Sequence, residues 1–356
     1  MELLIVNHRD PYHPKAGGAE HDLYETAKRL VKMGVQVTWL SEEVSGRPKE
    51  EELDGIRLMR RGNELTLHLY APLEARKHEI VMDSIAHAVP FFSFLTNDCA
   101  FAKIHHVHQL VLDYELPWYL SKPVKLAEKF SRFYKRVVVP SYTTMEEAVK
   151  LLKVRRERVT VIPEAVDLEK FRPGEKSPEP FVLWLHRLKK YKNPLMAIQA
   201  FDLAREKGLS KDVKLVMAGG GDLEPQVREE VRRRDYVVYL GRVSEEEKVR
   251  LLRQAWVFLS TSFIEGFGLS VLEASASGTP TIAFAVGSIE ELIKEGVNGW
   301  LVSYGNVSAM AEKIVQAFSD YSTLKKMWGS SRKEAEKYSW DRTALMYYDF
   351  LESFAC

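Results

Sequence analysis

The chain has 356 residues, of which 51 are basic and 50 acidic, so its formal net charge at pH 7 is only +1. This length is sufficient for two domains with separate cores, and the balanced charge gives no indication of a nucleic-acid partner. The longest apolar runs are too short to cross a bilayer, and the amino terminus leads directly into an apolar strand without a basic leader, so we expect a cytoplasmic protein. The low count of Asn and Gln beside 28% charged residues is typical of thermophilic proteins.

An alternation of strands and helices begins at the amino terminus. The apolar run Leu3–Val6 predicts a buried parallel strand, and a helix that ends at Gly34 separates it from the strand Val35–Leu40. Ligands of such units bind where a strand passes into a helix, and Gly17 and Gly18 lie in that loop. The spacing of a dinucleotide fingerprint is missing, so the glycines by themselves indicate a flexible turn.

Three histidines lie within and just after the predicted strand Lys103–Val107. His106 and His108 would share one face of that strand. Together with His105 they suggest a metal site, but no cysteine or carboxylate lies near them in the sequence at ligand spacing. Zinc sites need three or four protein ligands, so we expect no metal here.

A basic amphipathic helix is predicted over Pro123–Arg136. Aromatic residues at helical spacing usually face a core, which favours a packed helix with a solvated basic face. Basic amphipathic helices also lie on anionic lipid, so peripheral membrane contact through 123–136 is the alternative. The basic stripe is Lys125, Lys129, Arg132 and Arg136, and the apolar group on another face is Ala127, Phe130 and Tyr134.

The segment 173–180 is the one stretch rich in Pro and Gly, and we interpret it as a linker between domains. A second alternation begins after it with a strand at Phe181–Leu185. The following loop carries Arg187 and Lys192. A guanidinium fork and an ammonium at the end of a strand suit a pyrophosphate, although basic loops are more often solvated surface.

A glycine-rich loop followed by a short helix is the most informative stretch of the sequence. Gly266 and Gly268 let the backbone approach a ligand, and the helix Leu269–Ser277 would start with unpaired N–H groups and a partial positive charge. Glu265 before the helix and Glu273 within it flank these donors. Because a carboxylate accepts two hydroxyls at once, the stretch pairs an anion cradle with two diol acceptors, as a nucleotide-sugar requires.

The same stretch resembles a known family. Glu265-x7-Glu273, within Glu-Gly-Phe-Gly-Leu and before Gly278-Thr-Pro280, is similar to the donor-site signature of family-4 retaining glycosyltransferases. The resemblance implies the GT-B fold, an α/β architecture of two Rossmann-like domains facing across a cleft. The amino-terminal domain would be 1–172, the carboxy-terminal domain 181–338, and the segment 339–356 a helix that returns to the first domain.

The resemblance also implies roles for single residues. Glu273 would hold the ribose, Glu265 the sugar, and Arg187 with Lys192 the diphosphate. Four of the residues would take part in catalysis: Glu265, His108, Arg187 and Lys192. The full set expected to contact substrates is Gly17, Gly18, His108, Arg187, Lys192, Val243, Glu265, Gly266, Phe267, Gly268, Leu269 and Glu273.

Three positions depart from the family's pattern. His186 replaces a glycine before Arg187, Gln109 replaces an acidic residue after His108, and Glu164-Ala165 replaces Asn-Gly. These departures bear on the contacts of the three loops concerned.

The resemblance predicts transfer of a sugar from a UDP-, GDP- or ADP-sugar to a hydroxyl of a glycan, a lipid-linked acceptor or a small molecule, with retention of configuration. Since no Asp-x-Asp triplet occurs, we expect neither a metal nor a cofactor. An epimerase or a phosphorylase of the same fold is one alternative. A non-catalytic nucleotide-sugar-binding protein is the other.

Overall fold

A computed structural model describes residues 1–354 of the chain, apart from the side chains of residues 114 and 115. The chain forms two compact units. Unit 1 contains Met1–Ala165 and Trp340–Cys356, and unit 2 contains Val166–Ser339. Of the carboxy-terminal segment expected to return to the first domain, residues 355 and 356 lie outside the described part.

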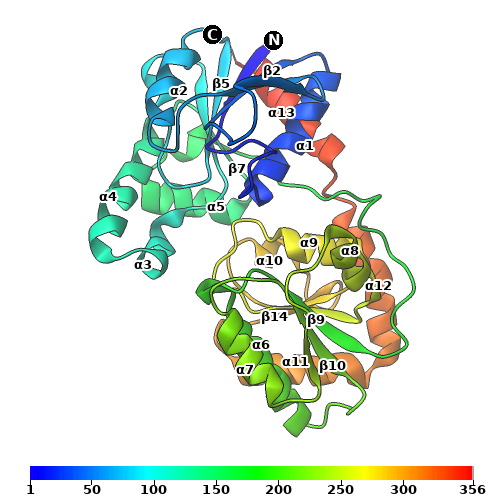
Figure 1. Cartoon of the computed structure of the whole chain (residues 1–356). Helices are drawn as coiled ribbons and strands as arrows, with labels where there is room; N and C mark the ends of the chain where they lie inside the picture. Colours follow the sequence, from blue (N-terminus) through cyan, green and yellow to red (C-terminus); the bar gives the residue numbers. More distant parts are fainter. Residues whose placement is uncertain (355–356) are drawn as a thin grey trace. The chain divides into compact units, whose positions relative to one another are not determined.

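Unit 1 is built on an eight-stranded sheet in the order β3-β4-β2-β1-β5-β6-β7-β8 (Figure 1). All neighbouring strands run parallel except β3 and β4, which pair antiparallel. The strands are β1 (Glu2–Val6), β2 (Gln36–Ser41), β3 (Glu50–Leu53), β4 (Ile56–Arg60), β5 (Ile80–Ile85), β6 (Ala100–Ile104), β7 (Val137–Val139) and β8 (Val159–Val161).

Helices cover both faces of this sheet because successive side chains of a strand point to opposite faces. Leu3 and Ile5 of β1 pack with the α1 and α13 side, whereas Leu4 and Val6 pack with the α2 side. The helices are α1 (Gly18–Lys32), α2 (Leu67–Ala75), α3 (Leu112–Glu115), α4 (Trp118–Glu128), α5 (Tyr142–Glu147) and α13 (Trp340–Glu352). Shorter turns are η1 (Ser93–Leu95), η2 (His108–Leu110), η3 (Lys129–Phe133), η4 (Ala148–Leu152) and η5 (Arg156–Arg158).

The carboxy-terminal helix α13 belongs to unit 1, although the whole of unit 2 precedes it in the chain. Its Tyr347 is fully buried in the same core cluster as Leu23 of α1. Arg29 Nε of α1 also contacts Asp341 Oδ1 at 2.7 Å. The apolar face of α13 is therefore buried against α1, as the amphipathic sequence of this segment requires.

Unit 2 repeats the architecture with six parallel strands in the order β11-β10-β9-β12-β13-β14 (Figure 1). The strands are β9 (Phe181–Leu185), β10 (Lys214–Ala218), β11 (Val237–Tyr239), β12 (Val257–Ser260), β13 (Thr281–Phe284) and β14 (Gly299–Val302). The helices are α6 (Pro194–Glu206), α7 (Glu224–Arg232), α8 (Glu245–Gln254), α9 (Leu269–Ala276), α10 (Ile289–Leu292), α11 (Val307–Ser319) and α12 (Tyr321–Ala335), with a turn η6 (Lys190–Lys192).

The composition of the segment 173–180 predicted a linker between the units. This is wrong, because the segment lies within unit 2. Lys176 Nζ donates to Thr279 Oγ1 at 2.7 Å, and Trp256 Nε1 donates to the carbonyl of Ser177 at 2.8 Å. The chain passes from one unit to the other at Ala165–Val166 instead. Proline and glycine mark where regular structure stops, but they do not specify which core the segment packs against.

Within residues 1–354, no helix is long and apolar enough to cross a membrane.

Candidate functional site

The start of α9 is shaped by a glycine that no other residue can replace without strain. Gly268 has φ +97°, and a Cβ there would lie 2.6 Å from Ile289 Cδ1. The carbonyl of Gly268 accepts from the amides of Val271 and Leu272 at 2.9 and 3.1 Å. The earlier amides of the first turn point out of the helix end, where α-helical geometry offers them no acceptor. The start of α9 thus presents free donors with the positive end of a helix dipole behind them.

Glu265 lies just before these donors and forms an ion pair with Lys192, which follows β9 on the turn η6. Ser262 Oγ also donates to Glu265 Oε1 at 2.7 Å. Burial works to raise the pKa of Glu265, but the charge of Lys192 and the hydrogen bonds from Lys192 and Ser262 outweigh it and lower the pKa. The side chains of Lys192 and Glu265 are 12% and 11% exposed, so the pair can still reach a ligand. The structure therefore brings together two residues that the sequence assigned to the diphosphate and the sugar.

Glu273 lies one helical turn further along α9 and is held by a residue that sequence reasoning missed. Lys248 Nζ of α8 donates to its Oε1 at 2.6 Å. Burial disfavours a charged ammonium, but Glu273 and Glu245 outweigh it and raise the pKa of Lys248. A lysine separated from its partner by 25 residues gives no local sequence signal, so only the packing of α8 against α9 shows the pair.

The histidine that replaces a family glycine packs beneath α9. His186 is 7% exposed, its ring lies 5.0 Å from that of Trp184, and its Nδ1 is 3.3 Å from Ser270 Oγ. Burial, followed by the nearby Lys192, lowers the pKa of His186 to about 3. The imidazole is thus neutral and supports the first turn of α9 from within unit 2.

Arg187, the other residue expected at the diphosphate, is exposed after β9. The three glycines at 219–221 sit behind this loop. A Cβ at Gly219 would lie 1.8 Å from the carbonyl oxygen of His186, and Leu188 N donates to the carbonyl of Gly220 at 3.0 Å. The glycine run therefore allows two backbones to approach and supports the basic loop. Val243 is half-buried between β11 and α8 and packs on the core that contains Phe267.

The Gly17-Gly18 turn of unit 1 is held by an acidic residue. The amide of Gly17, the residue before α1, donates to Glu20 Oε2 in the first turn of that helix at 2.7 Å. Asn7 Nδ2 at the end of β1 donates to Glu20 Oε1 at 2.9 Å. This network fixes the loop at the carboxyl end of β1, where ligands of such sheets bind.

His108 lies in unit 1 with both ring nitrogens partnered. Its Nδ1 is 3.0 Å from Glu128 Oε1, and its Nε2 is 3.1 Å from the carbonyl of Ala86. Gln109, which stands where the family has an acid, donates through Nε2 to Glu128 Oε2 at 2.7 Å. A carboxylate is thus present beside His108, but it comes from α4, twenty residues later in the chain. The predicted catalytic role of His108 stays a prediction.

Sequence reasoning missed a group of rings at the carboxyl ends of β1 and β5. The ring of His8 lies 5.2 Å from that of His68, 5.0 Å from that of His87 and 4.7 Å from that of Phe91. Burial is the main cause that lowers the pKa of His8 to about 3 and that of His87 to about 4. These side chains are neutral at pH 7 and offer one donor and one acceptor each.

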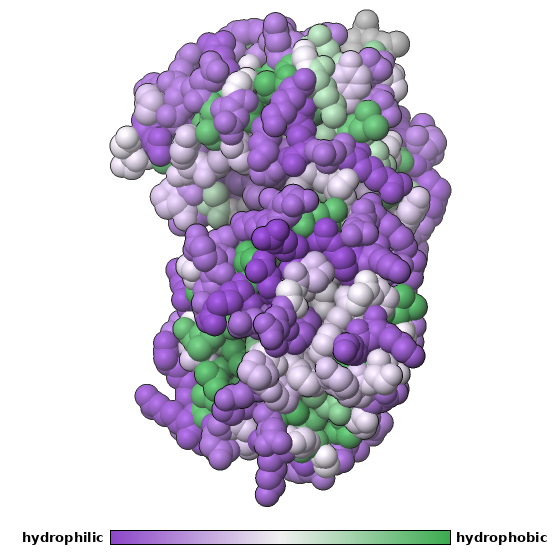
Figure 2. Space-filling model, turned by 90° about the vertical axis from the view of Figure 1, so that its right-hand side faces the viewer, coloured by the Kyte–Doolittle hydropathy of each residue, from purple (hydrophilic) through white to green (hydrophobic). Residues whose placement is uncertain are grey.

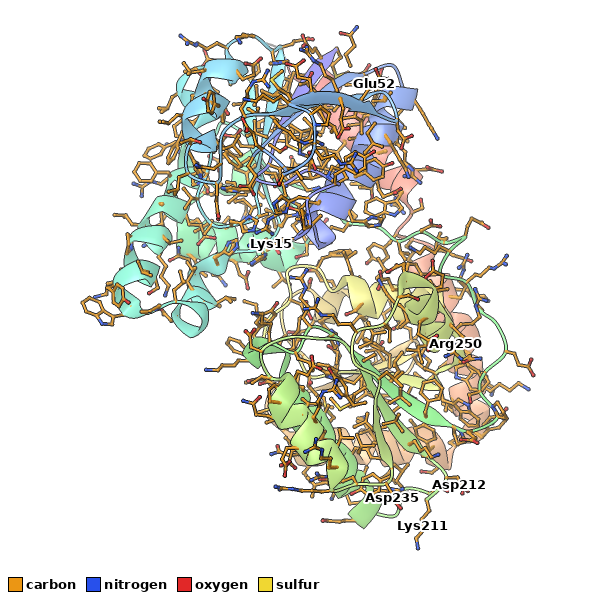
Figure 3. The ribbon with its side chains drawn as sticks, in the orientation of Figure 1. Lys15, Glu52, Lys211, Asp212, Asp235 and Arg250 are labelled. Carbon is orange, nitrogen blue, oxygen red and sulfur yellow. The ribbon has the colours of Figure 1, made fainter. Side chains whose placement is uncertain are left out.

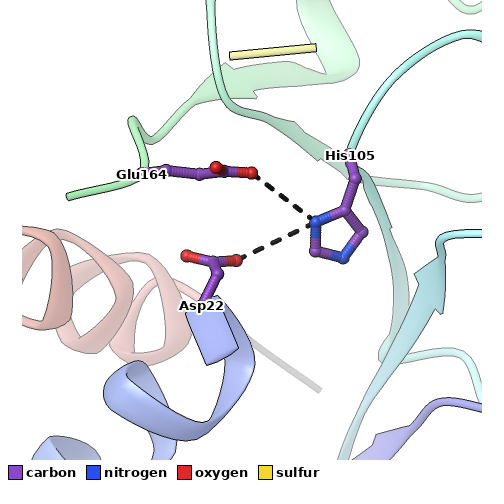
Figure 4. Close-up of side chains that lie close together, drawn as sticks. All are labelled: Asp22, His105 and Glu164. Atoms are coloured by element: carbon purple, nitrogen blue, oxygen red, sulfur yellow. Dashed lines mark ion pairs between the residues drawn. The ribbon is translucent and has the colours of Figure 1, made fainter. Parts of the chain in front are cut away.

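His105 has carboxylate neighbours that the sequence did not suggest (Figure 4). Its Nδ1 lies 3.9 Å from Asp22 Oδ2 and 3.7 Å from Glu164 Oε1. These three buried side chains have the types and spacing of a cation site. However, Lys103 Nζ already donates to Asp22 and supplies a buried positive charge. A metal ion would have to displace that ammonium, so the group fits an internal ion pair better than a metal site. Glu164, a departure from the family pattern, belongs to this group.

Charged residues also lie at the other edge of the unit 2 sheet. Lys211, Asp212 and Asp235 project where β10 and β11 begin, at the end of the unit away from α9 (Figure 3). Ligands of open parallel sheets bind at the carboxyl ends of the strands, so these residues are not part of the candidate site.

The chain matches known families over both units. Residues 166–334 match the family model described as "Glycosyl transferases group 1", and residues 16–170 match that of "Glycosyltransferase Family 4". Two curated relatives are an uncharacterized glycosyltransferase of Methanocaldococcus jannaschii, 28% identical over 63% of this chain, and a D-inositol 3-phosphate glycosyltransferase of Paenarthrobacter aurescens, 30% identical over 59% of this chain. The chain spans 62% and 55% of the lengths of these relatives.

Solved structures show the fold over nearly the whole chain. Sucrose-phosphate synthase of Thermosynechococcus elongatus superimposes with a TM-score of 0.80 at 20% identity and covers 99% of this chain and 98% of its own. Anabaena HepE, solved in complex with UDP and glucose, gives 0.77 at 19% identity and covers 99% of this chain and 100% of its own. These glycosyltransferase neighbours and the two sheets confirm the predicted GT-B fold.

Proposed function

We propose that this chain, a member of the family-4 type with the GT-B fold, transfers a hexosyl group from a nucleoside-diphosphate sugar to a hydroxyl acceptor with retention of configuration. The observation that carries the proposal is the arrangement at α9. One carboxylate lies on each side of the first-turn donors, and each is paired with a lysine from another element. A nucleotide-sugar has an anionic diphosphate between two polyols, which matches this order of groups.

Different residues of unit 2 bind different parts of the donor. Glu273 accepts the ribose hydroxyls while Lys248 holds its carboxylate in place. Glu265 accepts hydroxyls of the transferred sugar. The α9 amides, Lys192 and Arg187 bind the diphosphate, and Val243 contributes to the base pocket through its backbone.

Sugar transfer breaks the bond between the anomeric carbon and the diphosphate oxygen, and it forms a bond between that carbon and the acceptor oxygen. Negative charge then develops on the leaving diphosphate, where Lys192, Arg187 and the helix start stabilise it. The acceptor hydroxyl gives its proton to the leaving phosphate, on the face from which the diphosphate departs, so the configuration is retained. Gly17, Gly18 and His108 contribute the acceptor side of the reaction.

Basic side chains and a helix start take the place that a divalent ion has in other nucleotide-sugar enzymes, and we propose that turnover needs neither a metal nor a cofactor. Turnover should persist in EDTA and should not rise when magnesium or manganese is added. Loss of turnover in EDTA and its rescue by one divalent ion would contradict the assignment of Lys192 and Arg187.

The function is tested by incubating the protein with UDP-, GDP- and ADP-sugars, with and without hydroxyl acceptors, and following products by NMR. UDP-glucose is the first donor to try, because a solved neighbour contains it. D-inositol 3-phosphate belongs in the acceptor panel, because it appears in the names of curated relatives. An acceptor-linked α-glycoside from an α-linked donor supports the proposal. An isomerised donor would indicate an epimerase, a sugar phosphate formed with free phosphate would indicate a phosphorylase, and binding without any turnover would indicate a non-catalytic protein.

A further inference from the structure

In helix α4 and the following turn η3, polar residues face the protein and large apolar residues face outward, the reverse of a usual amphipathic helix. The residues that face the protein are Ser121, Glu128 and Ser131, all buried. The residues that face outward are large and apolar: Trp118 is 70% exposed, Tyr119 59%, Leu126 64%, Phe130 41% and Phe133 48%. The sequence favoured a packed helix with its aromatic residues toward a core, and this is wrong for Phe130. Of the predicted apolar group, only Tyr134 is fully buried.

The inner side of this segment is attached by polar contacts. Ser121 Oγ donates to Asp113 Oδ1 at 2.9 Å, and Ser131 Oγ donates to the carbonyl of Glu128 at 2.6 Å. The Glu128 carboxylate accepts from the His108 amide at 2.6 Å and from Gln109 Nε2 at 2.7 Å. Because these bonds satisfy the buried polar groups, the helix keeps its place without burying its aromatic side chains.

Exposed apolar side chains also occur on α2, which ring contacts connect to η3. Ring contacts connect the two elements: Phe92 lies 5.8 Å from Phe130 and 6.4 Å from His68 of α2. The outer side of α2 adds Leu69, which is 69% exposed, and Leu73, which is 51% exposed. By contrast, the side of unit 1 that carries α1 and α13 is largely hydrophilic, with small scattered apolar patches (Figure 2). Large continuous apolar surfaces on a protein mark sites of contact with partners or membranes.

The charge of the same segment indicates what binds to this apolar surface. Residues 117–136 contain six basic residues and one acid, Glu128, although the whole chain is nearly neutral. That acid is buried, and Lys125 and Lys135 pair with the exposed Asp113 and Asp98 from outside the segment. The other basic residues of this segment include Lys122, Lys129 and Arg132. Lys122 Nζ lies 5.1 Å above the ring of Trp118, which places a cation directly beside an exposed aromatic residue. Aromatic and basic side chains together suit the headgroup level of an anionic bilayer, where the rings enter the boundary and the ammonium groups meet phosphates.

We propose that α4 and η3, together with the outer side of α2, dock unit 1 onto an anionic lipid bilayer. The apolar side chains enter the headgroup boundary, and Lys122, Lys129 and Arg132 bind lipid phosphates. Glu128 connects the inner side of the same helix to His108. Docking therefore places the acceptor side of unit 1 next to lipid, which favours a lipid-linked acceptor.

The test is flotation with vesicles of equal parts phosphatidylglycerol and phosphatidylcholine, compared with pure phosphatidylcholine, at low and at physiological salt. The wild-type protein should float with the anionic vesicles and less so as salt rises. Trp118→Ser with Leu126→Ser should lower the partition coefficient about tenfold or more, since two exposed apolar side chains no longer enter the boundary. Lys122→Gln with Lys129→Gln should remove the preference for anionic lipid.

Matched controls come from exposed residues elsewhere. Leu345 of α13 is 51% exposed and Lys211 lies at the amino-terminal edge of the unit 2 sheet, so Leu345→Ser and Lys211→Gln should float like the wild type. Thermal melting confirms that each variant is folded. Failure of the wild type to float with anionic vesicles at low salt overturns the proposal. A wild-type dimer that Leu126→Ser converts to monomers would also overturn it, because a second copy would then cover this surface.

Discussion

The carboxyl ends of the two parallel sheets are chemically different. In unit 2 they carry the ion pairs Lys192–Glu265 and Lys248–Glu273, whose side chains are between 11% and 21% exposed. In unit 1 they carry rings, with His8 and His87 kept neutral by burial. The charge pairs Lys103–Asp22 and Arg60–Asp10 near the unit 1 strand ends are buried, with side chains at most 4% exposed.

The two sheets thus differ in how far water reaches the charged pairs at their strand ends. One residue of a partly exposed ion pair can leave its partner and bind a charged ligand, because water still reaches both side chains. A fully buried pair cannot exchange without leaving an uncompensated charge, so it acts only on stability. The ion pairs at α9 can therefore exchange with a charged ligand, whereas the buried pair Lys103–Asp22 cannot.

The largest expected effect comes from the buried pair Lys103–Asp22 of unit 1. Lys103→Met leaves the Asp22 carboxylate buried without its partner, and the free energy of unfolding should fall by about 3–5 kcal/mol. Chemical denaturation measures this change. The double variant Lys103→Met/Asp22→Leu should recover most of the loss, because no unpaired charge remains. A loss below about 1 kcal/mol in the single variant would show that the pair is not structural.

The next effect separates the two glutamates at α9. Glu273→Ala should weaken both the free nucleoside diphosphate and the nucleotide-sugar by about 1.5–3 kcal/mol, as for a lost hydrogen bond to a charged group. Glu265→Gln should lower turnover, because its contact is to the reacting sugar, and should not weaken diphosphate binding, because the change frees Lys192 from its ion pair. Calorimetry with the diphosphate and kinetics with the sugar donor measure the two effects. Equal losses of diphosphate affinity would refute this division.

A pH series tests the neutral imidazoles of unit 1. Burial lowers the pKa of His8 to about 3 in the folded protein, against about 6.5 for an unperturbed histidine, so between these pH values the unfolded chain binds a proton that the folded protein does not. The stability from this histidine is complete above pH 6.5 and is lost as pH falls from there toward 3. Between pH 6 and 4, the free energy of unfolding of His8→Gln should fall less steeply with decreasing pH than that of the wild type. The two slopes should differ by about 1.4 kcal/mol per pH unit, which is the slope for one bound proton. An unchanged slope in denaturation curves would show that His8 takes up its proton in the folded protein as well.

The smallest effect belongs to an exposed pair in the basic loop of unit 2. Lys189 contacts Asp222 at 2.6 Å, but the side chains are 41% and 75% exposed. Lys189→Ala should change the free energy of unfolding by about 0.2–1 kcal/mol and leave diphosphate affinity unchanged, because solvent screens the pair. Arg187→Ala in the same loop is the matched comparison and should weaken diphosphate binding. Equal effects of both variants on binding would mean that the loop acts only through its net charge.

Sequence by itself determined the first strand–helix–strand unit of unit 1, the strand β9 and the start of α9. These features are local: a buried strand needs a short apolar run, and Gly268 is required by a positive φ at the helix start. The two glutamates could be placed relative to α9 because helical spacing relates residues a few positions apart. The cap of α8 is equally local, since Ser244 Oγ accepts from Glu247 N at 3.1 Å.

Tertiary structure alone decided which side chains pair across elements. Lys248 reaches Glu273 from α8, Glu128 reaches His108 from α4, and Glu164 lies beside His105 although 59 residues separate them in the chain. It also decided that α4 faces outward with its aromatic side chains, since helical periodicity defines two faces but does not say which one meets the protein. Periodicity and backbone geometry act over a few residues, whereas pairing and burial depend on which elements the sheet order brings together.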